Sequence, residues 1–389
     1  MKKALLASTA IVTAAALASP AAAADRIKLG LGGYMEQYVG FIQQEDGDKL
    51  ASGQELRNFK LFDEQSDSEV YFSGSTTLDN GIKLALRMEL EGDAGAATID
   101  ESWLDIQTAW GTLRLGADDP VSDLMSVEPR RGILNDYNNW VPAVGGNTIA
   151  LANANSNVTV DDPYGVRTAA DDNGVIYISP RIAGFTTAVS YQPEMGSGGA
   201  NGTPNSVTDA GSALSATLNW AGPVGPVAIS TGYAYLHEES AVPGAAGNFV
   251  SHNVGLNVSY AGIGLGVAYG RWLEKDSVTT TAATNTQAGS SSVDGHMYVV
   301  GLWYISGPIE VGYNYKFQTV QGQTINAAGI GGNGNDDNTL NGAYFNYQIS
   351  DGVKWESMVF HVDYDDELSL DAASHSGGWG VVGGLRLDF

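Results

Sequence analysis

The sequence predicts an all-β protein: a sixteen-stranded antiparallel transmembrane β-barrel with a long third external loop folded into the pore. Three observations lead to this prediction. Apolar and polar residues alternate in runs of about ten residues, the length that a tilted strand needs to cross a bilayer. Short turns alternate strictly with long polar connections. Aromatic residues recur close to the short turns, as in the interfacial belt of a membrane barrel.

The clearest single strand is the last one, residues 379–389. Its odd positions are apolar and end on Phe389, whereas Arg386 and Asp388 occupy the other face. Successive side chains of a strand point to opposite faces, so this strand has one apolar and one charged face. We expect the apolar face to meet lipid and the charged face to meet water.

The first 24 residues have the features of a secretory signal peptide. Lys2 and Lys3 precede an apolar run, and small residues continue to Ala24, where we expect cleavage after export by the Sec route. The barrel domain would then comprise residues 25–389 and lie outside the cytoplasm. No later run approaches the roughly 20 consecutive apolar residues of a membrane helix.

The composition narrows the possible partners. The formal charge is −25, and removal of Lys2 and Lys3 would take it to −27. A protein this acidic does not attract nucleic acid through its net field. Cysteine is absent, so backbone pairing and packing must hold the fold together.

The first hairpin shows the pattern in detail. A strand begins at Ile27, a polar connection covers residues 43–65, and the return strand ends in Asp79-Asn80-Gly81, a turn sequence that accepts positive φ. In the next strand Leu84, Leu86 and Met88 alternate with Ala85, Arg87 and Glu89. We expect the leucines to face lipid and Arg87 to face the lumen.

The same unit then repeats along the chain. The predicted strand pairs are 102–110 with 113–116, 175–180 with 185–191, 214–220 with 227–235, 252–260 with 265–272, 297–305 with 309–317, and 340–349 with 353–364. We expect the third of these pairs to turn at Gly222-Pro223. Trp110, Trp220, Tyr260 and Tyr304 each lie within two residues of a short turn. The inward faces of 297–305 and 353–364 cannot be assigned from the pattern.

One connection is far longer than its neighbours, residues 118–173. Long loops in compact proteins are usually functional or disordered, and the apolar residues of this one favour a folded loop. Asp119-Pro120 can cap and start a short helix with Val121, Leu124 and Met125 on one face. Such a loop would pack on the inner wall and narrow the channel.

Charged residues of this loop and of the wall are the candidate constriction site. The loop offers Asp118, Asp119, Asp123, Glu128 and Asp136 with Arg130 and Arg131, and the wall offers Arg87 at mid-height with Lys28, Arg114 and Arg386 nearer the periplasmic end. If Asp119 and Asp123 face Arg87, a transverse field forms and orients dipolar solutes. Alternatively, most of the loop charges are solvated like those of the other loops. We expect a mild preference for cations.

Several motifs together resemble a known family. They are Ile27-Lys28-Leu29-Gly30-Leu31-Gly32-Gly33, the Leu78-Asp79-Asn80-Gly81 turn, Gly111-Thr112-Leu113-Arg114-Leu115-Gly116, Tyr177-Ile178-Ser179-Pro180-Arg181-Ile182-Ala183-Gly184-Phe185, and the terminal Phe389. The mature chain resembles the general diffusion porins of Gram-negative outer membranes, most closely those of Alphaproteobacteria. This resemblance implies a homotrimer, a pore constricted by the third external loop, and recognition of Phe389 by the outer-membrane barrel assembly machinery. It also implies contact with outer-membrane lipid and lipopolysaccharide.

The leading hypothesis is a passive channel for small hydrophilic solutes and ions, without a cofactor. One alternative is a substrate-selective porin with a binding site in the barrel, and another is a structural or adhesion barrel plugged by its long loop. An enzyme is disfavoured because the five histidines lack metal-ligand spacing, and because His252 and the adjacent Ser251 face opposite sides. Acidic clusters at Asp63-Glu64 and 363–367 could bind Ca²⁺ in external loops, but hydration of the loops is the favoured role.

Overall fold

The structure is a computed structural model of the chain. It describes residues 27–44, 62–92, 99–133, 172–195, 211–240, 248–277, 291–321, 335–365 and 375–389. The expected signal peptide (residues 1–24) and most of the long loop, Asp136 included, lie outside the described residues. No helix in the described part of the chain is long and apolar enough to cross a membrane.

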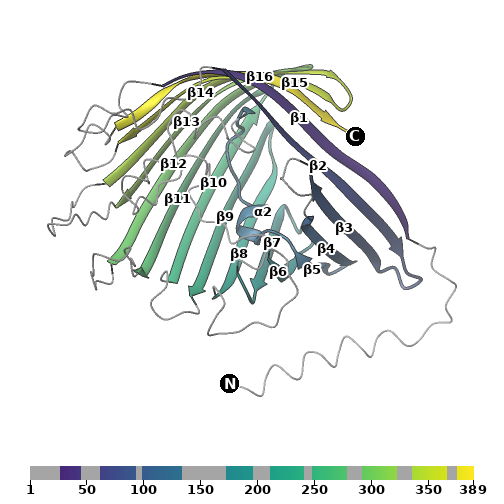
Figure 1. Cartoon of the computed structure of the whole chain (residues 1–389). Coiled ribbons are helices and arrows are strands. Elements are labelled where there is room, and N and C mark those ends of the chain that lie inside the picture. The colour runs from purple at the N-terminus through teal and green to yellow at the C-terminus, as the bar shows by residue number, and fades with distance from the viewer. Residues whose placement is uncertain are drawn as a thin grey trace.

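Within those ranges the chain forms sixteen strands in one closed antiparallel barrel, which confirms the predicted fold class (Figure 1). The strands are Lys28–Gln44 (β1), Phe62–Thr77 (β2), Lys83–Glu91 (β3), Ile99–Thr108 (β4), Gly111–Ala117 (β5), Asn173–Ile178 (β6), Phe185–Gln192 (β7), Gly211–Val224 (β8), Val227–Ser240 (β9), Asn248–Tyr260 (β10), Ile263–Ser277 (β11), Ser291–Ser306 (β12), Ile309–Gln321 (β13), Asn335–Ser350 (β14), Val353–Asp365 (β15) and His375–Asp388 (β16). One short helix, Val121–Leu124 (α2), follows β5.

The barrel closes between β1 and β16. These strands pair antiparallel with Tyr34 opposite Asp388. Just beyond this ladder, the Gly33 N–H donates to the Phe389 carbonyl over 2.9 Å, and the Phe389 N–H donates to the Gly33 carbonyl over 3.0 Å. A closed ladder leaves no unpaired strand edge, which is what a sheet surrounded by lipid requires.

The short turns lie close to their predicted places, with one exception. Strand β8 continues through Pro223, which pairs with Ala228, so the turn falls at Gly225-Pro226 and not at Gly222-Pro223. Gly225 has φ +60°, a conformation that glycine adopts without strain. The turn therefore forms at the second Gly-Pro pair, three residues after the predicted one.

The alternation seen in the sequence corresponds to two faces of the wall. Leu29, Leu31 and Val39 of β1 are exposed on the outside, whereas Glu36 and Tyr38 are buried on the lumen side. Trp110 and Tyr260 are exposed at short turns. Both observations agree with an outer face made for lipid and an aromatic belt at the short-turn end.

The two strands with ambiguous faces are now assigned. In β12, Met297 and Val299 face inward and are buried, and in β15 Met358 and Phe360 do the same. The inward residues of β15 join a buried apolar cluster with Tyr38 and other residues of the neighbouring wall. In this part of β15 apolar residues lie on both faces, so the alternation that would identify the faces is lost there.

Candidate pore constriction

The first stretch after β5 lies inside the barrel. We call residues 118–133 the inner segment; its helix α2 contacts β7, β8 and β9, and it is seen within the ring of strands in Figure 1. The helix is present where the sequence predicts it, but its cap differs. Pro120 is the N-cap residue and no side chain caps the helix, so Asp119 does not have the expected role. Val121 is fully buried, whereas Leu124, expected on the same apolar face, is 42% exposed.

Serines of the barrel wall replace the missing cap. The Val121 N–H donates to Oγ of Ser190 over 3.1 Å, and the Ser122 N–H donates to Oγ of Ser215 over 2.7 Å. The first N–H groups of a helix have no partner within it and need one from outside. The wall therefore fixes the start of the inner segment through its backbone.

Three asparagines of the wall hold the rest of the inner segment, and we call them the asparagine ladder. Nδ2 of Asn219 donates to the Met125 carbonyl over 2.6 Å. Nδ2 of Asn257 donates to the Glu128 carbonyl, and Nδ2 of Asn314 donates to the Arg130 carbonyl, each over 2.7 Å. The inner segment has no regular structure after α2, so these side chains provide partners for carbonyl groups that would otherwise lack them.

Glycines beside this ladder let the inner segment approach the wall closely. We call Gly232, Gly255, Gly266 and Gly301 the glycine track. A Cβ atom on Gly255 would lie 1.5 Å from the Val127 carbonyl oxygen, and one on Gly301 would lie 2.7 Å from Cβ of Pro129. A side chain at Gly255 or Gly301 would push the inner segment off the wall.

An arginine fixes the point where the inner segment leaves β5. Nε of Arg114 lies 2.8 Å from Oδ1 of Asp105, and Nη1 lies 2.6 Å from Oδ2 of Asp118. The guanidinium also stacks on Trp103, 4.2 Å from the ring centroid. Asp118 is thus bound to the wall and is buried, so it does not offer its charge freely to the pore.

A polar cavity of about 460 Å³ separates the inner segment from the opposite wall, and we call it the first cavity. Its charged lining residues are Glu36, Asp123, Glu128, Arg130, Arg131, Glu310, Lys354 and Glu356. The cations are paired: Arg130 with Glu310 over 3.0 Å, Arg131 with Glu128 over 2.7 Å and Lys354 with Glu356 over 2.5 Å. Carboxylates outnumber cations in this lining, which gives the first cavity a net negative charge.

A second cavity, of about 570 Å³, lies against β1 to β5 nearer the short turns. Its charged lining residues are Lys28, Lys83, Arg87, Asp105 and Arg114, so cations predominate. Arg87 pairs with Glu89 and stacks on Tyr71, 3.8 Å from the ring centroid. The two cavities therefore differ in the sign of their fixed charge.

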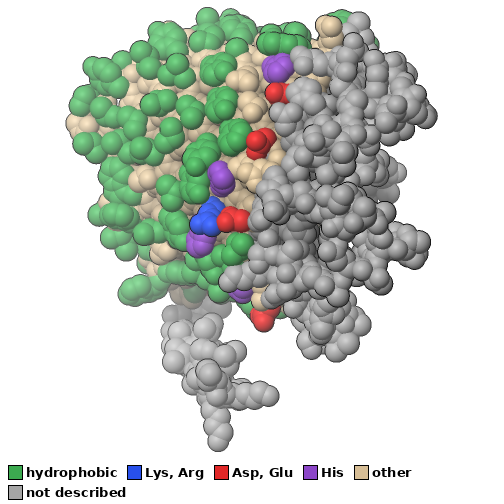
Figure 2. All heavy atoms as spheres, turned by 90° about the vertical axis from the view of Figure 1, so that its left-hand side faces the viewer, with side chains coloured by type: hydrophobic (Ala, Val, Ile, Leu, Met, Phe, Trp, Pro, Cys, Tyr) green, Lys and Arg blue, Asp and Glu red, His purple; other side chains and the backbone are tan. Residues whose placement is uncertain are grey.

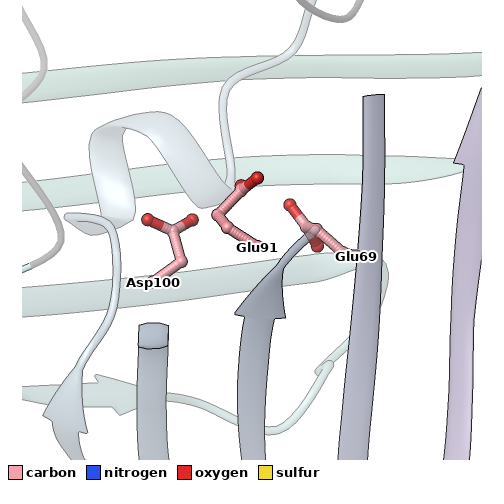
Figure 3. A group of neighbouring side chains, drawn as sticks. All are labelled: Glu69, Glu91 and Asp100. Atoms are coloured by element: carbon pink, nitrogen blue, oxygen red, sulfur yellow. The ribbon is translucent and has the colours of Figure 1, made fainter. Parts of the chain in front are cut away.

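Three carboxylates gather where the long-loop ends of β3 and β4 lie beside the middle of β2 (Figure 3). One oxygen from each of Glu69, Glu91 and Asp100 lies within 4.8 Å of the others. Oxygen ligands of this kind suit Ca²⁺, but Ca²⁺ takes about six to eight of them. The group adds negative charge to the wall and does not by itself complete a calcium site. Of the acidic clusters expected to bind Ca²⁺, Asp63-Glu64 is exposed at the start of β2, and residues 366 and 367 lie outside the described part.

The structure separates the predicted site residues into groups. The first cavity is lined by Asp123, Glu128, Arg130 and Arg131, and the second is lined by Lys28, Arg87 and Arg114. Arg386 lines neither cavity, but it pairs with Asp388 and with Glu36, which lines the first cavity. Asp119 lines neither of the two cavities, and Asp123 and Arg87 line different ones. The transverse field between Arg87 and the two aspartates stays a prediction.

Sequence reasoning missed the residues that position the inner segment. The asparagine ladder and the glycine track lie at inward positions of strands whose opposite face is apolar. A run of small and amide residues at lumen positions is the one signal that could have indicated them. Glu310 and Glu356 were also missed, because their partners are distant in sequence.

A closed barrel with an apolar exterior, charged inner cavities and a segment fixed to its inner wall defines a membrane channel protein of the outer-membrane type. The family model of the Gram-negative porins matches residues 7–367. The chain therefore belongs to the Gram-negative porin family, and its location is the outer membrane.

Solved structures of porins share the fold at low sequence identity. An anion-selective porin from Comamonas acidovorans has a TM-score of 0.61 at 17% identity, over 94% of this chain and 100% of that one. A loop L8 deletion mutant of OmpT, an outer-membrane protein of Vibrio cholerae, has a TM-score of 0.59 at 13% identity, over 94% and 100% of the two chains. A mutant porin of Rh. blastica has a TM-score of 0.51 at 16% identity, over 93% and 100%. The comparison with curated proteins gave no match.

Proposed function

We propose that this porin is a passive, non-enzymatic channel for small hydrophilic solutes and ions. The observation that carries the proposal is the first cavity, a polar space between the inner segment and the opposite wall lined by charged residues from both sides. Fixed charges around a water-filled passage replace part of the hydration of a passing ion, without any covalent step. Residues 118–173 would form the constriction loop, of which the inner segment is the first part.

We also propose a mild preference for cations. Charges within about 8 Å act on an ion at physiological salt, whereas more distant ones are screened. The first cavity has an excess of carboxylates, and Glu69, Glu91 and Asp100 give the wall further negative charge. The cations of the second cavity keep the preference weak, because an anion still meets favourable charge on part of its path.

A substrate-selective porin is the second candidate. Stacking of Arg87 on Tyr71 and of Arg114 on Trp103 gives the lumen wall flat, cationic surfaces that could bind a particular solute. Such a site would slow that solute and saturate.

Single-channel recording in a planar bilayer tests these readings. A general pore gives a conductance that rises linearly with salt, and a solute site gives saturation by one solute. A barrel plugged by its loop gives no conductance. The zero-current potential across a salt gradient measures the selectivity. We expect a small potential whose sign indicates a preference for cations. The opposite sign, which indicates a preference for anions, would refute the proposal.

We propose a homotrimer as the assembled form. One solved structure of Vibrio cholerae OmpT, with a TM-score of 0.57, is a trimer form. We further propose that the barrel assembly machinery recognises Phe389 and that the outer face of the barrel contacts lipopolysaccharide. Native mass spectrometry of the purified protein would show the subunit number directly.

A further inference from the structure

Histidines recur on the lipid-facing side of the wall. His237, His252, His296 and His361 all lie at outward positions of their strands, where the neighbours along each strand face inward and are buried. The sequence shows five histidines without a common motif, so this shared orientation emerges only from the barrel. Figure 2 shows that the histidines and charged groups on this face are confined to part of an otherwise hydrophobic surface.

These histidines also share a position along the barrel axis. Each lies eight to ten residues from the short-turn end of its strand: His252 from Tyr260, and His296 from Ser306. Arg271 lies eight residues from Ile263. At about 3.3 Å per residue and a tilt near 40°, this distance is about 20–25 Å along the axis, and the apolar band of such barrels is about 25 Å tall. The polar groups therefore lie at the far edge of the lipid belt, on the long-loop side.

Three of these residues form a compact patch. In the strand register His252 pairs with Arg271, and Arg271 pairs with His296, so the three lie side by side on β10, β11 and β12. We call them the headgroup patch. Adjacent strands are about 4.8 Å apart, so its donors span about 10 Å.

Neighbouring side chains hold the patch in one orientation. Asp294 binds Arg271 through Nε over 3.1 Å and Nη2 over 2.6 Å, which engages one edge of the guanidinium and leaves Nη1 for another acceptor. The Tyr233 hydroxyl lies 2.7 Å from Nδ1 of His252, so Nε2 is the ring nitrogen left for a further partner. Arg271 and Asp294 are 56% and 39% exposed, so the pair remains accessible from outside.

We propose that the headgroup patch binds the phosphate group of an outer-leaflet lipid. A phosphate offers several acceptor oxygens, and an arginine flanked by two imidazoles supplies donors over a matching width. An ionised side chain facing lipid is costly at mid-depth and much less so at the interface, so the position of the patch suits the headgroup region. Tyr269 and Tyr298, with ring centroids 5.0 Å apart, flank the patch as interfacial aromatics do.

The experiment compares two lipids on the full chain in detergent. Native mass spectrometry measures the retention of lipopolysaccharide and of lipopolysaccharide whose phosphates have been removed enzymatically. We expect the phosphorylated form to bind about tenfold more tightly or better, as charge-assisted hydrogen bonds predict. The variant His252→Gln/Arg271→Gln/His296→Gln should lose this preference. The control Lys28→Gln/Lys83→Gln removes two cations that line the second cavity inside the barrel and should keep it.

Three results would overturn the proposal. Equal retention of the two lipids by the wild type would exclude the phosphate as the ligand, and this comparison needs no variant to fold. An unchanged preference in the triple variant would place the phosphate elsewhere. Loss of the oligomer in the triple variant without any lipid would make the patch a subunit contact.

Arg271→Lys gives a milder test, because it keeps the positive charge but removes the planar guanidinium and its paired N–H donors. We expect this variant to show an intermediate preference for the phosphorylated lipid. The proposal rests on the outer-membrane location and not on passive diffusion. Because the patch lies outside the pore, the triple variant should keep the wild-type conductance, and this separates the two proposals.

Discussion

Substitution of Gly255 by alanine tests whether the inner segment is fixed by close contact with the wall. The new Cβ would lie 1.5 Å from the Val127 carbonyl oxygen, whereas ordinary contact begins near 3.4 Å, so the inner segment must retreat by about 1.9 Å. The two nearest atoms, the carbonyl oxygen and carbonyl carbon of Val127, are backbone, so rotation of a side chain cannot relieve the clash. A retreat of this size would also break the 2.7 Å bond from Asn257 to the Glu128 carbonyl.

The size of the effect follows from the first cavity. A volume of about 460 Å³ has a linear dimension of about 7.7 Å, so an advance of about 1.9 Å into it removes about a quarter of its cross-section. We expect the single-channel conductance of Gly255→Ala to fall by about that fraction. Loss of the asparagine bond should in addition lower the free energy of unfolding by about 1–3 kcal/mol.

The matched control is Gly30→Ala, which adds the same methyl group to β1. A Cβ atom there would be 3.7 Å from its nearest neighbour, the Ser73 carbonyl oxygen, which is ordinary contact. This variant should keep the conductance and the stability of the wild type. If the two variants behaved alike in bilayer recordings and in thermal unfolding, the inner segment would not lie on the glycine track.

Three further predictions concern the wall, the ion pairs and assembly. Leu86→Arg should lower the free energy of unfolding in lipid by about 2–4 kcal/mol, because it places a charge on the lipid face. Ala85→Arg adds a charge to the second cavity instead and should be tolerated. Equal losses of stability would mean that the facing assigned to β3 is wrong. Arg114→Gln should remove the cation that pairs with two carboxylates and lower the stability by about 1–3 kcal/mol. It should also shift the zero-current potential in the direction of greater cation selectivity. An unchanged potential would mean that Arg114 does not lie on the ion path. Deletion of Phe389 should reduce the amount of barrel in the outer membrane, measured by surface protease accessibility, without changing the conductance of barrels refolded in vitro; equal amounts would show that this residue is not an assembly signal.

The barrel could be predicted from the sequence because its main constraint is local. A strand between lipid and water must alternate, and Leu84, Leu86 and Met88 show this without knowledge of any distant residue. The faces of a strand could not be predicted where this alternation is absent. Met358, Phe360 and Val362 of β15 face inward and pack in an apolar cluster, so this part of the strand has apolar residues on both faces.

The candidate site was predicted less completely because it is made of distant pairs. Charged residues of the inner segment could be identified as candidates, since a long loop in a wide barrel has to fold somewhere. Their partners could not: Arg130 pairs with Glu310, 180 residues away, and only the closed barrel brings them together. The role of Gly255 was hidden for the same reason, because a glycine indicates close approach only when the approaching atom is known.

The seam between β1 and β16 has a consequence for the order in which the barrel folds. Most neighbouring strands are joined by short turns or single loops, so their pairing closes small loops at little entropic cost. The seam instead joins Tyr34 to Asp388, and contacts so distant in sequence form slowly. We therefore expect hairpins to form first and the seam last. Until it forms, two unpaired edges are exposed to any other extended chain, so a catalyst of assembly would act most effectively at this one junction.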